Sequence, residues 1–294
     1  MSEVAPAGIG GSTRVYGVIG WPVSASLSPP IHNAAFAALE LDAVYVALPV
    51  APGEMTAAVP GLRALGLAGA NVTMPHKTEA ARLADRLSDD AGRLEAANTL
   101  EVTPSGVVGH NTDAPGFERF LRTDAGFDAS GKRVLLFGAG GAARACALSL
   151  ARSEIAHVDV AVRDPARAGS LRTILDEHGV GNRAVTLGDE AGIAALEPDL
   201  VVNATPVGAR GEALPVPKLS GSTLVVDLIY RPVVTPLLAA AREARAGAFG
   251  GLGLLLHQAA LSFQIWTGLE PPMPVMWAAA MAHLGRSPAD TDPA

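Results

Sequence analysis

The chain has only one cysteine, few aromatic residues and no cluster of basic residues. A single cysteine, Cys146, excludes an internal disulfide framework and a zinc site built from several cysteines. Basic residues number 22 against 29 acidic ones, for a net charge of −7, and this balance argues against nucleic-acid binding. The sequence also lacks an apolar run long enough to span a membrane.

Apolar residues, in contrast, are plentiful. They make up 49% of 294 residues, enough for a sizeable core, and the length predicts about two domains. The first residues have neither the basic nor the apolar region of a secretory signal, and with the single cysteine this predicts a cytoplasmic location. Histidines are not spaced as ligands on one helix face, so we expect no metal site.

Short apolar runs alternate with longer Ala/Leu-rich segments along most of the chain. This alternation is typical of βαβ units, and continuous apolar runs are typical of parallel strands buried on both faces. We therefore predict an α/β protein. The expected strands are Arg14–Ile19, Ala43–Pro49, Gly69–Val72, Thr99–Val102, Lys132–Phe137, Val158–Val162, Leu200–Asn203 and Leu224–Asp227. The expected helices are Pro29–Leu39, Glu54–Leu65, Ala142–Arg152, Pro165–His178 and Leu237–Ala248.

The alternation of strands and helices changes at two places, which are candidate domain boundaries. Asn111–Gly116 is followed by a helical segment, a turn-rich stretch and a fresh strand, and beyond Gly250–Gly253 only helical patterns remain. We predict one domain from residues 1–115, to which residues 254–294 return, and a second domain from residues 116–253.

The second domain opens with a glycine turn. Gly138-x-Gly140-x-x-Ala143 follows an apolar strand and begins a helical pattern, which is the context that the dinucleotide fingerprint requires. Gly138 permits the tight turn, Gly140 allows the backbone to approach a pyrophosphate, and the helix start offers free N–H groups. The alternative is a tight turn with a purely structural role.

The end of the next strand reads VDVAVRDPARA and carries signals for two cofactors. Arg163 and Arg167 suit the 2′-phosphate of NADP. Asp164 suits the ribose hydroxyl of NAD, or alternatively caps a helix that starts at Pro165. The sequence favours NADP and leaves NAD open.

Polar residues gather at strand ends in the first domain. Ser26 and Ser28 alternate in an extended loop, where Ser28 before a proline also fits a helix N-cap. Lys77 follows a strand at an expected helix start, where the helix dipole disfavours a cation. Asn98 and Asp113 lie in turns, where such residues often bond only local backbone. Their concentration at strand ends favours a ligand site.

Together these segments resemble the shikimate dehydrogenase family over nearly the whole chain. The motifs, in order, are SxSPxxHN (26–33), NVTxPxK (71–77), ANT (97–99), NTDxxG (111–116), GAGGAAR (138–144), NATPxG (203–208), DLIYxPxxTPL (227–237) and GLGxLLxQ (251–258). The resemblance implies an N-terminal substrate domain with a mainly parallel sheet, a Rossmann-type NADP-binding domain, and a cleft between them. It implies reversible NADPH-dependent reduction of 3-dehydroshikimate to shikimate, a step in the biosynthesis of chorismate and aromatic amino acids.

The resemblance also implies site residues. Lys77 and Asp113 would be the catalytic acid–base pair. The residues expected to contact substrate are Ser26, Ser28, Thr73, Lys77, Asn98, Asp113, Tyr230 and Gln258. Those expected to contact the cofactor are Gly138, Ala139, Gly140, Gly141, Ala142, Arg163, Asp164, Arg167, Thr205, Leu228 and Gly251. The substrate would be a small molecule, and a homodimer is left open.

Two positions depart from the family pattern. Ala25 stands where the family often has histidine. Val162-Arg163-Asp164 stands where the family usually has Asn-Arg-Thr, so Arg163 is kept and Asp164 replaces a neutral hydroxyl. The acid leaves open an NAD-preferring quinate/shikimate dehydrogenase, although the intact Ser26/Ser28 pair favours shikimate. A nucleotide- or shikimate-sensing protein without catalysis, and another two-domain dehydrogenase, are more remote alternatives.

Overall fold

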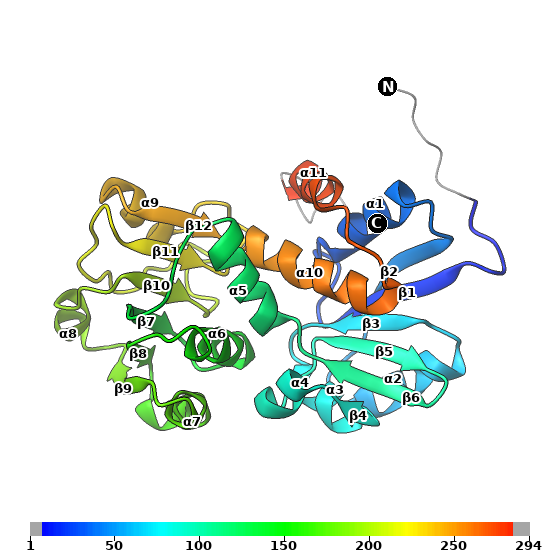
Figure 1. The fold of residues 1–294 in the computed structure, drawn as a ribbon, viewed down its shortest axis with the longest axis horizontal. Helices are drawn as coiled ribbons and strands as arrows, with labels where there is room; N and C mark the ends of the chain where they lie inside the picture. Colours follow the sequence, from blue (N-terminus) through cyan, green and yellow to red (C-terminus); the bar gives the residue numbers. More distant parts are fainter. Residues whose placement is uncertain (1–7, 285–294) are drawn as a thin grey trace. The chain divides into compact units, whose positions relative to one another are not determined.

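The computed structural model describes residues 8–284 (Figure 1). Their chain divides into two compact units: residues 8–112 with 258–284 form unit 1, and residues 113–257 form unit 2. These divisions lie beside the predicted ones at 115/116 and 253/254. One helix, α10 (Leu252–Thr267), begins in unit 2 and continues into unit 1. Which ligand each unit binds stays a prediction at this point.

Unit 1 is built on a six-stranded sheet in the order β2-β1-β3-β5-β6-β4. The first three are parallel, β5 runs antiparallel to β3 and to β6, and β4 is parallel to β6. The strands are β1 (Arg14–Gly20), β2 (Ala43–Pro49), β3 (Gly69–Val72), β4 (Arg86–Leu87), β5 (Thr99–Thr103) and β6 (Gly106–His110). The helices are α1 (Ser28–Ala38), α2 (Met55–Ala64), α3 (Lys77–Leu83), α4 (Asp89–Leu94) and α11 (Met273–Leu284), the last packed on α1.

Unit 2 contains a six-stranded, fully parallel sheet in the order β12-β11-β10-β7-β8-β9 (Figure 1). The strands are β7 (Arg133–Phe137), β8 (His157–Val162), β9 (Gly181–Thr186), β10 (Leu200–Asn203), β11 (Leu224–Asp227) and β12 (Gly247–Gly250). The helices are α5 (Asp113–Thr123), α6 (Gly141–Ala151), a 3₁₀ turn η1 (Pro165–Ala168), α7 (Gly169–Glu177), α8 (Glu190–Ala194) and α9 (Pro236–Glu243).

The continuous apolar runs are explained by burial on both faces of this sheet. Along β7, Val134 and Leu136 pack into a core with residues of α5, α6 and α7. The alternate residues Leu135 and Phe137 pack into a second core with residues of α8 and α9. Successive side chains of a strand point to opposite faces, so a strand covered on both sides must be apolar throughout. The predicted α/β class is confirmed.

Two predicted helices are wrong in part. The expected helix Leu237–Ala248 ends at Glu243, and its tail becomes β12, whose Gly247 pairs with Leu224 of β11. Long-range pairing therefore overrides the local helical preference of alanine. The expected helix Pro165–His178 is split into η1 and α7. The strands β4, β6, β9 and β12 were not predicted. β4 has only two residues, β6 and β12 are short and rich in glycine, and β9 is polar and half-exposed, so none of them shows a clear strand pattern.

One face of the unit 1 sheet carries a cluster of aromatic rings from β1, β2, α1 and α10. Tyr16 lies 5.3 Å from Phe36 and 5.0 Å from Trp266 between ring centroids. His32 stacks on Tyr45 at 4.4 Å, is fully buried, and has no hydrogen-bond partner for either ring nitrogen in the described structure. Burial penalises the charged ring and lowers the pKa of His32 to about 3, an effect that the nearby Asn71 amide opposes in part.

Residues 8–284 contain no helix long and apolar enough to cross a membrane, and no group of three or more His, Cys, Asp or Glu side chains placed to hold a metal. Cys146 is buried in the core of unit 2 and is not in a disulfide.

Candidate active site

In unit 1, the loops that follow β1 and β3 are bound to each other at one edge of the sheet. The two strands are parallel neighbours, so their carboxyl ends meet. The N–H of Thr73 donates to Ile19 O at 2.8 Å, and that of Trp21 donates to Met74 O at 3.1 Å. A methyl group at Gly20 would collide with Thr73 Cγ2, so only glycine allows this close approach. Thr73 is thus held where open α/β sheets bind ligands.

The serine loop differs from the expected helix cap. The N-cap of α1 is Leu27, which offers no side-chain cap, and Ser28 is already inside the first turn. Instead, Ser26 Oγ accepts a hydrogen bond from the N–H of Ser28 at 3.2 Å. α1 therefore has no side-chain cap, and Ser28 is a buried polar residue whose presence capping does not explain.

Lys77 is the first residue of α3, as its motif position predicted. Its helix has no side-chain cap at His76, whose ring contacts Val50 O at 2.8 Å. The carbonyl of Lys77 accepts from the N–H of Ala97 at 2.9 Å, which ties the lysine to the segment containing Asn98. A cation at a helix start is disfavoured by the helix dipole. Helix stability therefore gives no reason for a lysine here, whereas binding or proton transfer does.

Asn98 lies at the centre of a buried polar network in unit 1. Its Oδ1 accepts from the N–H of Thr112 at 2.7 Å. Its Nδ2 donates to Thr112 Oγ1 at 2.9 Å and to Gln258 Oε1 at 3.3 Å. Because a backbone N–H can only donate, the bond from Thr112 fixes which end of the Asn98 amide faces which partner. Two predicted substrate residues 160 positions apart, Asn98 and Gln258, are thereby brought together.

Asp113, the second predicted catalytic residue, is the first residue of α5 in unit 2 and is 9% exposed. The chain before it is held firmly, since Asn111 Nδ2 donates to Ala96 O at 2.9 Å and Thr112 is bonded to Asn98. Its position is therefore set by contacts that the short polar motif supplies.

In unit 2, the glycine turn after β7 has the geometry that a dinucleotide requires. Gly138 has φ +103°, and a methyl group there would lie 2.9 Å from Thr205 Cγ2. Gly140 is the N-cap of α6 and makes no side-chain cap, and a methyl group at Gly140 or Gly141 would meet nothing within 4 Å. The open space before an uncapped helix start fits a pyrophosphate, whose charge the helix N–H groups would bind. Ala139 and Ala142 complete this turn.

After β8, Asp164 is a helix cap. Its Oδ1 accepts from the N–H of Ala166 at 3.0 Å at the start of η1. The sequence left open a helix cap and a bond to the ribose hydroxyl of NAD, and the structure shows Asp164 as the helix cap. Arg163 and Arg167 are both exposed beside it. The two guanidinium groups suit a ribose phosphate, and the engaged carboxylate weakens the case for a ribose contact.

Next to the glycine turn lies a hydrogen-bonded cluster that the sequence did not predict, formed by Asp227 and Asn203; we call it the hub. Both are fully buried, and Asp227 accepts from Asn203 Nδ2 at 3.0 Å, from Thr235 Oγ1 at 2.7 Å and from the N–H of Ile229 at 3.1 Å. Asn203 in turn accepts from Thr205 Oγ1 at 2.7 Å. Burial raises the pKa of Asp227, and these three donors partly oppose the rise. The motifs NATPxG and DLIYxPxxTPL contain all these residues, so their polar positions were the available signal.

The hub supports the last predicted cofactor residues. The N–H of Leu228 donates to Asn203 O at 2.9 Å, and the N–H of Gly251 donates to Ile229 O at 3.1 Å. A methyl group at Gly251 would collide with the carbonyl of Leu228, so this position requires glycine. Burial raises the pKa of the nearby Tyr230 hydroxyl, and the positive charge of Arg231 opposes the rise. Tyr230 is therefore a neutral hydroxyl near pH 7.

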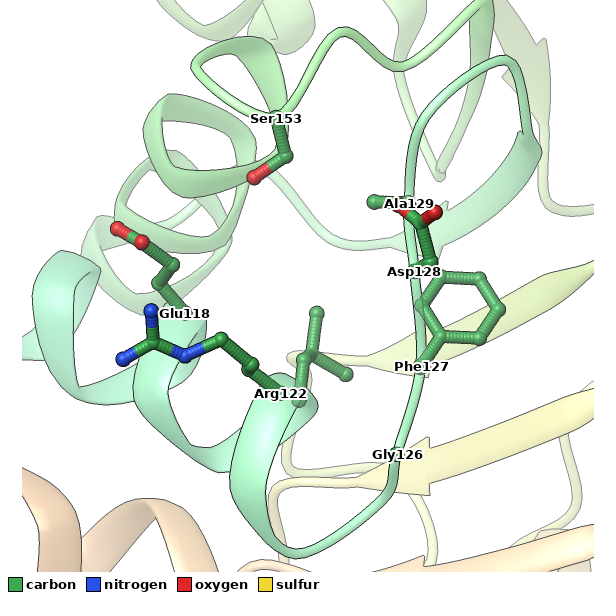
Figure 2. A pocket seen from close by; sticks show the side chains of 8 residues that line it. Glu118, Arg122, Gly126, Phe127, Asp128, Ala129 and Ser153 are labelled. Carbon is green, nitrogen blue, oxygen red and sulfur yellow. The ribbon is translucent and has the colours of Figure 1, made fainter.

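A separate cavity of about 360 Å³ lies in unit 2, between α5, the loop that follows it and the end of α6 (Figure 2). It contains none of the predicted site residues. Its lining consists of Glu118, Leu121, Arg122, Gly126, Phe127, Asp128, Ala129 and Ser153.

Two family models match the chain. The shikimate dehydrogenase substrate binding domain matches residues 18–100, and the shikimate 5′-dehydrogenase C-terminal domain matches residues 251–281. The shikimate dehydrogenase (NADP(+)) of Citrifermentans bemidjiense is 43% identical over 284 residues, which cover 94% of this chain and 97% of that protein.

Solved structures of shikimate dehydrogenases are also similar to this chain. A shikimate dehydrogenase crystallised in complex with NADP⁺ superimposes with a TM-score of 0.86 at 35% identity, covering 96% of this chain and 99% of that one. The shikimate 5-dehydrogenase of Thermus thermophilus, in complex with NADP(H) and shikimate, gives a TM-score of 0.81 at 35% identity, covering 92% and 100%. These likenesses extend over nearly the full length of each protein, and the chain therefore belongs to the shikimate dehydrogenase family.

Proposed function

We propose that this chain is an NADP-dependent shikimate dehydrogenase, which reversibly reduces 3-dehydroshikimate to shikimate in the route to chorismate. The observation that carries the proposal is the polar edge of unit 1, where hydrogen bonds join the segment of Thr73 and Lys77 to that of Asn98, and Asn98 to the distant Gln258. The relatives named shikimate dehydrogenase (NADP(+)) and the bound structures support the substrate and the cofactor.

The substrate offers a carboxylate and ring hydroxyls, and short donors and acceptors suit both. Ser26 and Ser28 would bind the carboxylate, Thr73, Asn98 and Gln258 the ring hydroxyls, and Tyr230 the substrate at the nicotinamide end. The fixed amide of Asn98 matters here, because a group held by Thr112 needs no reordering when the substrate binds.

Lys77 and Asp113 would be the acid–base pair. A ketone that gains a hydride develops negative charge on its oxygen, and a positioned ammonium stabilises that charge and then donates its proton. In the reverse direction, the proton of the alcohol returns to the pair. The reduced nicotinamide supplies the hydride when bound, and the protein supplies orientation and the proton.

Gly138, Gly140 and Gly141 would hold the pyrophosphate at the start of α6. Arg163 and Arg167 would bind the 2′-phosphate, which selects NADP over NAD. Asp164 caps η1 beside these two arginines.

A homodimer and a cytoplasmic location complete the proposal. The single buried cysteine suits a reducing compartment. Light scattering of the purified chain would measure its mass, and a mass of one chain would contradict the dimer.

The proposal is tested by absorbance at about 340 nm with shikimate or quinate and either NADP⁺ or NAD⁺. We expect reduction of NADP⁺ with shikimate. Lys77→Ala should lower kcat by at least about a hundredfold while NADP⁺ binding persists. Lys218→Ala is the matched control, since this exposed lysine forms a surface ion pair with Glu197 in unit 2. Near-normal turnover by Lys77→Ala would contradict the assigned role, and a folded wild-type chain inactive with shikimate would contradict the function.

A further inference from the structure

Ser262 is a buried hydroxyl at a junction of unit 1. It lies on α10, one helical turn after Gln258, and is fully buried. Its Oγ donates to the carbonyl of Gln258 at 3.0 Å and accepts from Asn71 Nδ2 at 2.9 Å. Thr99 Oγ1 lies at 2.8 Å and Thr112 Oγ1 at 3.2 Å. These partners come from β3, β5, the loop after β6, and α10 itself, so one side chain joins four separate segments.

The hydrogen-bonding capacity of a serine hydroxyl matches the partners that surround Ser262. A serine hydroxyl has one proton and two lone pairs. Donation to the carbonyl of Gln258 leaves two acceptor sites, which the Asn71 amide and the Thr112 hydroxyl can fill, because Thr99 Oγ1 donates its own proton to Asn98 Oδ1 at 3.2 Å. The Asn71 amide is itself oriented, because Tyr45 Oη donates to its Oδ1 at 2.7 Å, so that Nδ2 faces Ser262. The amide that donates to Ser262 is therefore constrained from its far side.

The network ends at two side chains that the proposed function places on the substrate. Thr112, held at 3.2 Å by Ser262, is the residue that fixes both ends of the Asn98 amide. Asn98 donates to Gln258 Oε1, and the backbone of Gln258 receives the Ser262 proton. A shift of α10 by a fraction of an ångström would thus change the distance between Asn98 and Gln258.

We propose that Ser262 is a positioning residue that sets the spacing and amide orientation of Asn98 and Gln258 for substrate binding. This inference rests on the proposed function, since it names what those two side chains bind. Ser262 itself touches no ligand in this scheme. It acts on affinity for the polyol substrate through its neighbours, and its bonds lead to none of the cofactor residues of unit 2.

The test is the kinetics of Ser262→Ala. The variant should fold, because Asn71 Nδ2 keeps Asn98 O at 3.2 Å and Thr99 Oγ1 at 3.1 Å as acceptors. We expect KM for shikimate to rise roughly tenfold, the loss of about one well-placed hydrogen bond, while KM for NADP⁺ changes less than about twofold. Thr112→Val, of similar volume, removes the neighbouring hydroxyl and should have the same selective effect.

Ser149→Ala is the matched control. Ser149 is also a buried helical serine, lies in unit 2, and its Oγ has no hydrogen-bond partner in the described structure. Its removal should leave both KM values unchanged. A serine that merely supports the fold would behave differently from Ser262, because general loosening raises both KM values and lowers the melting temperature together.

A double-mutant cycle of Ser262→Ala with Gln258→Ala tests whether Ser262 affects substrate binding through Gln258. If Ser262 acts through Gln258 and Asn98, the double variant should lose clearly less than the product of the two single losses in kcat/KM. Multiplicative losses, or an unchanged KM for shikimate in Ser262→Ala, would overturn the positioning role while leaving the function standing. Absence of shikimate oxidation by the wild-type chain would overturn both.

Discussion

The buried His32 makes the stability of unit 1 depend on pH in a predictable direction. Its ordinary pKa is 6.5, and burial lowers it to about 3 in the folded chain. Between these values the unfolded chain binds a proton that the folded chain excludes, so the free energy of unfolding falls as the pH falls below 6.5. Each pH unit in this window is worth about 1.4 kcal/mol, and the loss from this residue between pH 7 and pH 5 is about 2 kcal/mol.

The perturbation is His32→Leu, which keeps a similar volume and removes the titrating ring. We would follow urea unfolding by tryptophan fluorescence at pH 7, 6 and 5. The three tryptophans, at 21, 266 and 277, all belong to unit 1, so the signal reports the unit that contains His32. The wild-type free energy should fall by about 2 kcal/mol more than that of the variant over this range.

Phe36→Leu is the control. Phe36 is buried, and its ring lies 6.3 Å from that of His32 between centroids, but it carries no titratable group. Its loss should lower stability by a similar amount at every pH. A wild-type-minus-His32→Leu difference that stays constant from pH 7 to pH 5 would refute the reasoning, because it would mean that His32 is protonated as readily in the fold as in the unfolded chain.

Two further predictions concern the cofactor. Gly140→Ala should melt at the wild-type temperature, because a methyl group there meets nothing within 4 Å, and it should raise KM for NADP⁺ roughly tenfold by blocking the pyrophosphate. Gly251→Ala should raise this KM and also lower the melting temperature, because its methyl group collides with the carbonyl of Leu228. Normal NADP⁺ kinetics in Gly140→Ala would contradict the assigned cradle. Asp164→Ser keeps a capping oxygen and removes the charge, so the ratio of kcat/KM for NADP⁺ to that for NAD⁺ should rise several-fold at unchanged stability. An unchanged ratio would show that this carboxylate does not sense the 2′-phosphate.

Local patterns predicted the elements that are buried on both sides. Strands such as Gly69–Val72 and Leu200–Asn203 were bounded correctly, because a short apolar run between turn residues is typical of a buried strand. β12 was missed because Ala-rich sequence favours a helix locally, whereas its pairing with β11 is a long-range interaction. Polar edge strands such as β9 carry little periodic signal.

In the candidate site, too, local sequence patterns were predictable and long-range contacts were not. The motif positions of Lys77, Asn98 and Gln258 could be predicted from the sequence, but their contacts could not. The bonds from Asn71 to Ser262 and from Asn98 to Gln258 span 191 and 160 positions, and no window of the sequence predicts which hydroxyl meets which amide. The hub at Asp227 was missed for a related reason, since an acid at a strand end is compatible with both capping and burial.

The division of the chain has a consequence for the order in which the protein is made. Unit 2 is continuous in sequence, so a ribosome releases all of its residues before unit 1 is complete. Unit 1 must wait for α10, which brings Ser262 to Asn71 and Trp266 Nε1 to the carbonyl of Leu100 at 3.1 Å. Until then, the amide of Asn71 and the carbonyl of Leu100 lack these partners in a half-built core. A nascent or C-terminally truncated chain would accordingly combine a complete unit 2 with an incomplete unit 1, and chaperones and proteases would act on the incomplete unit.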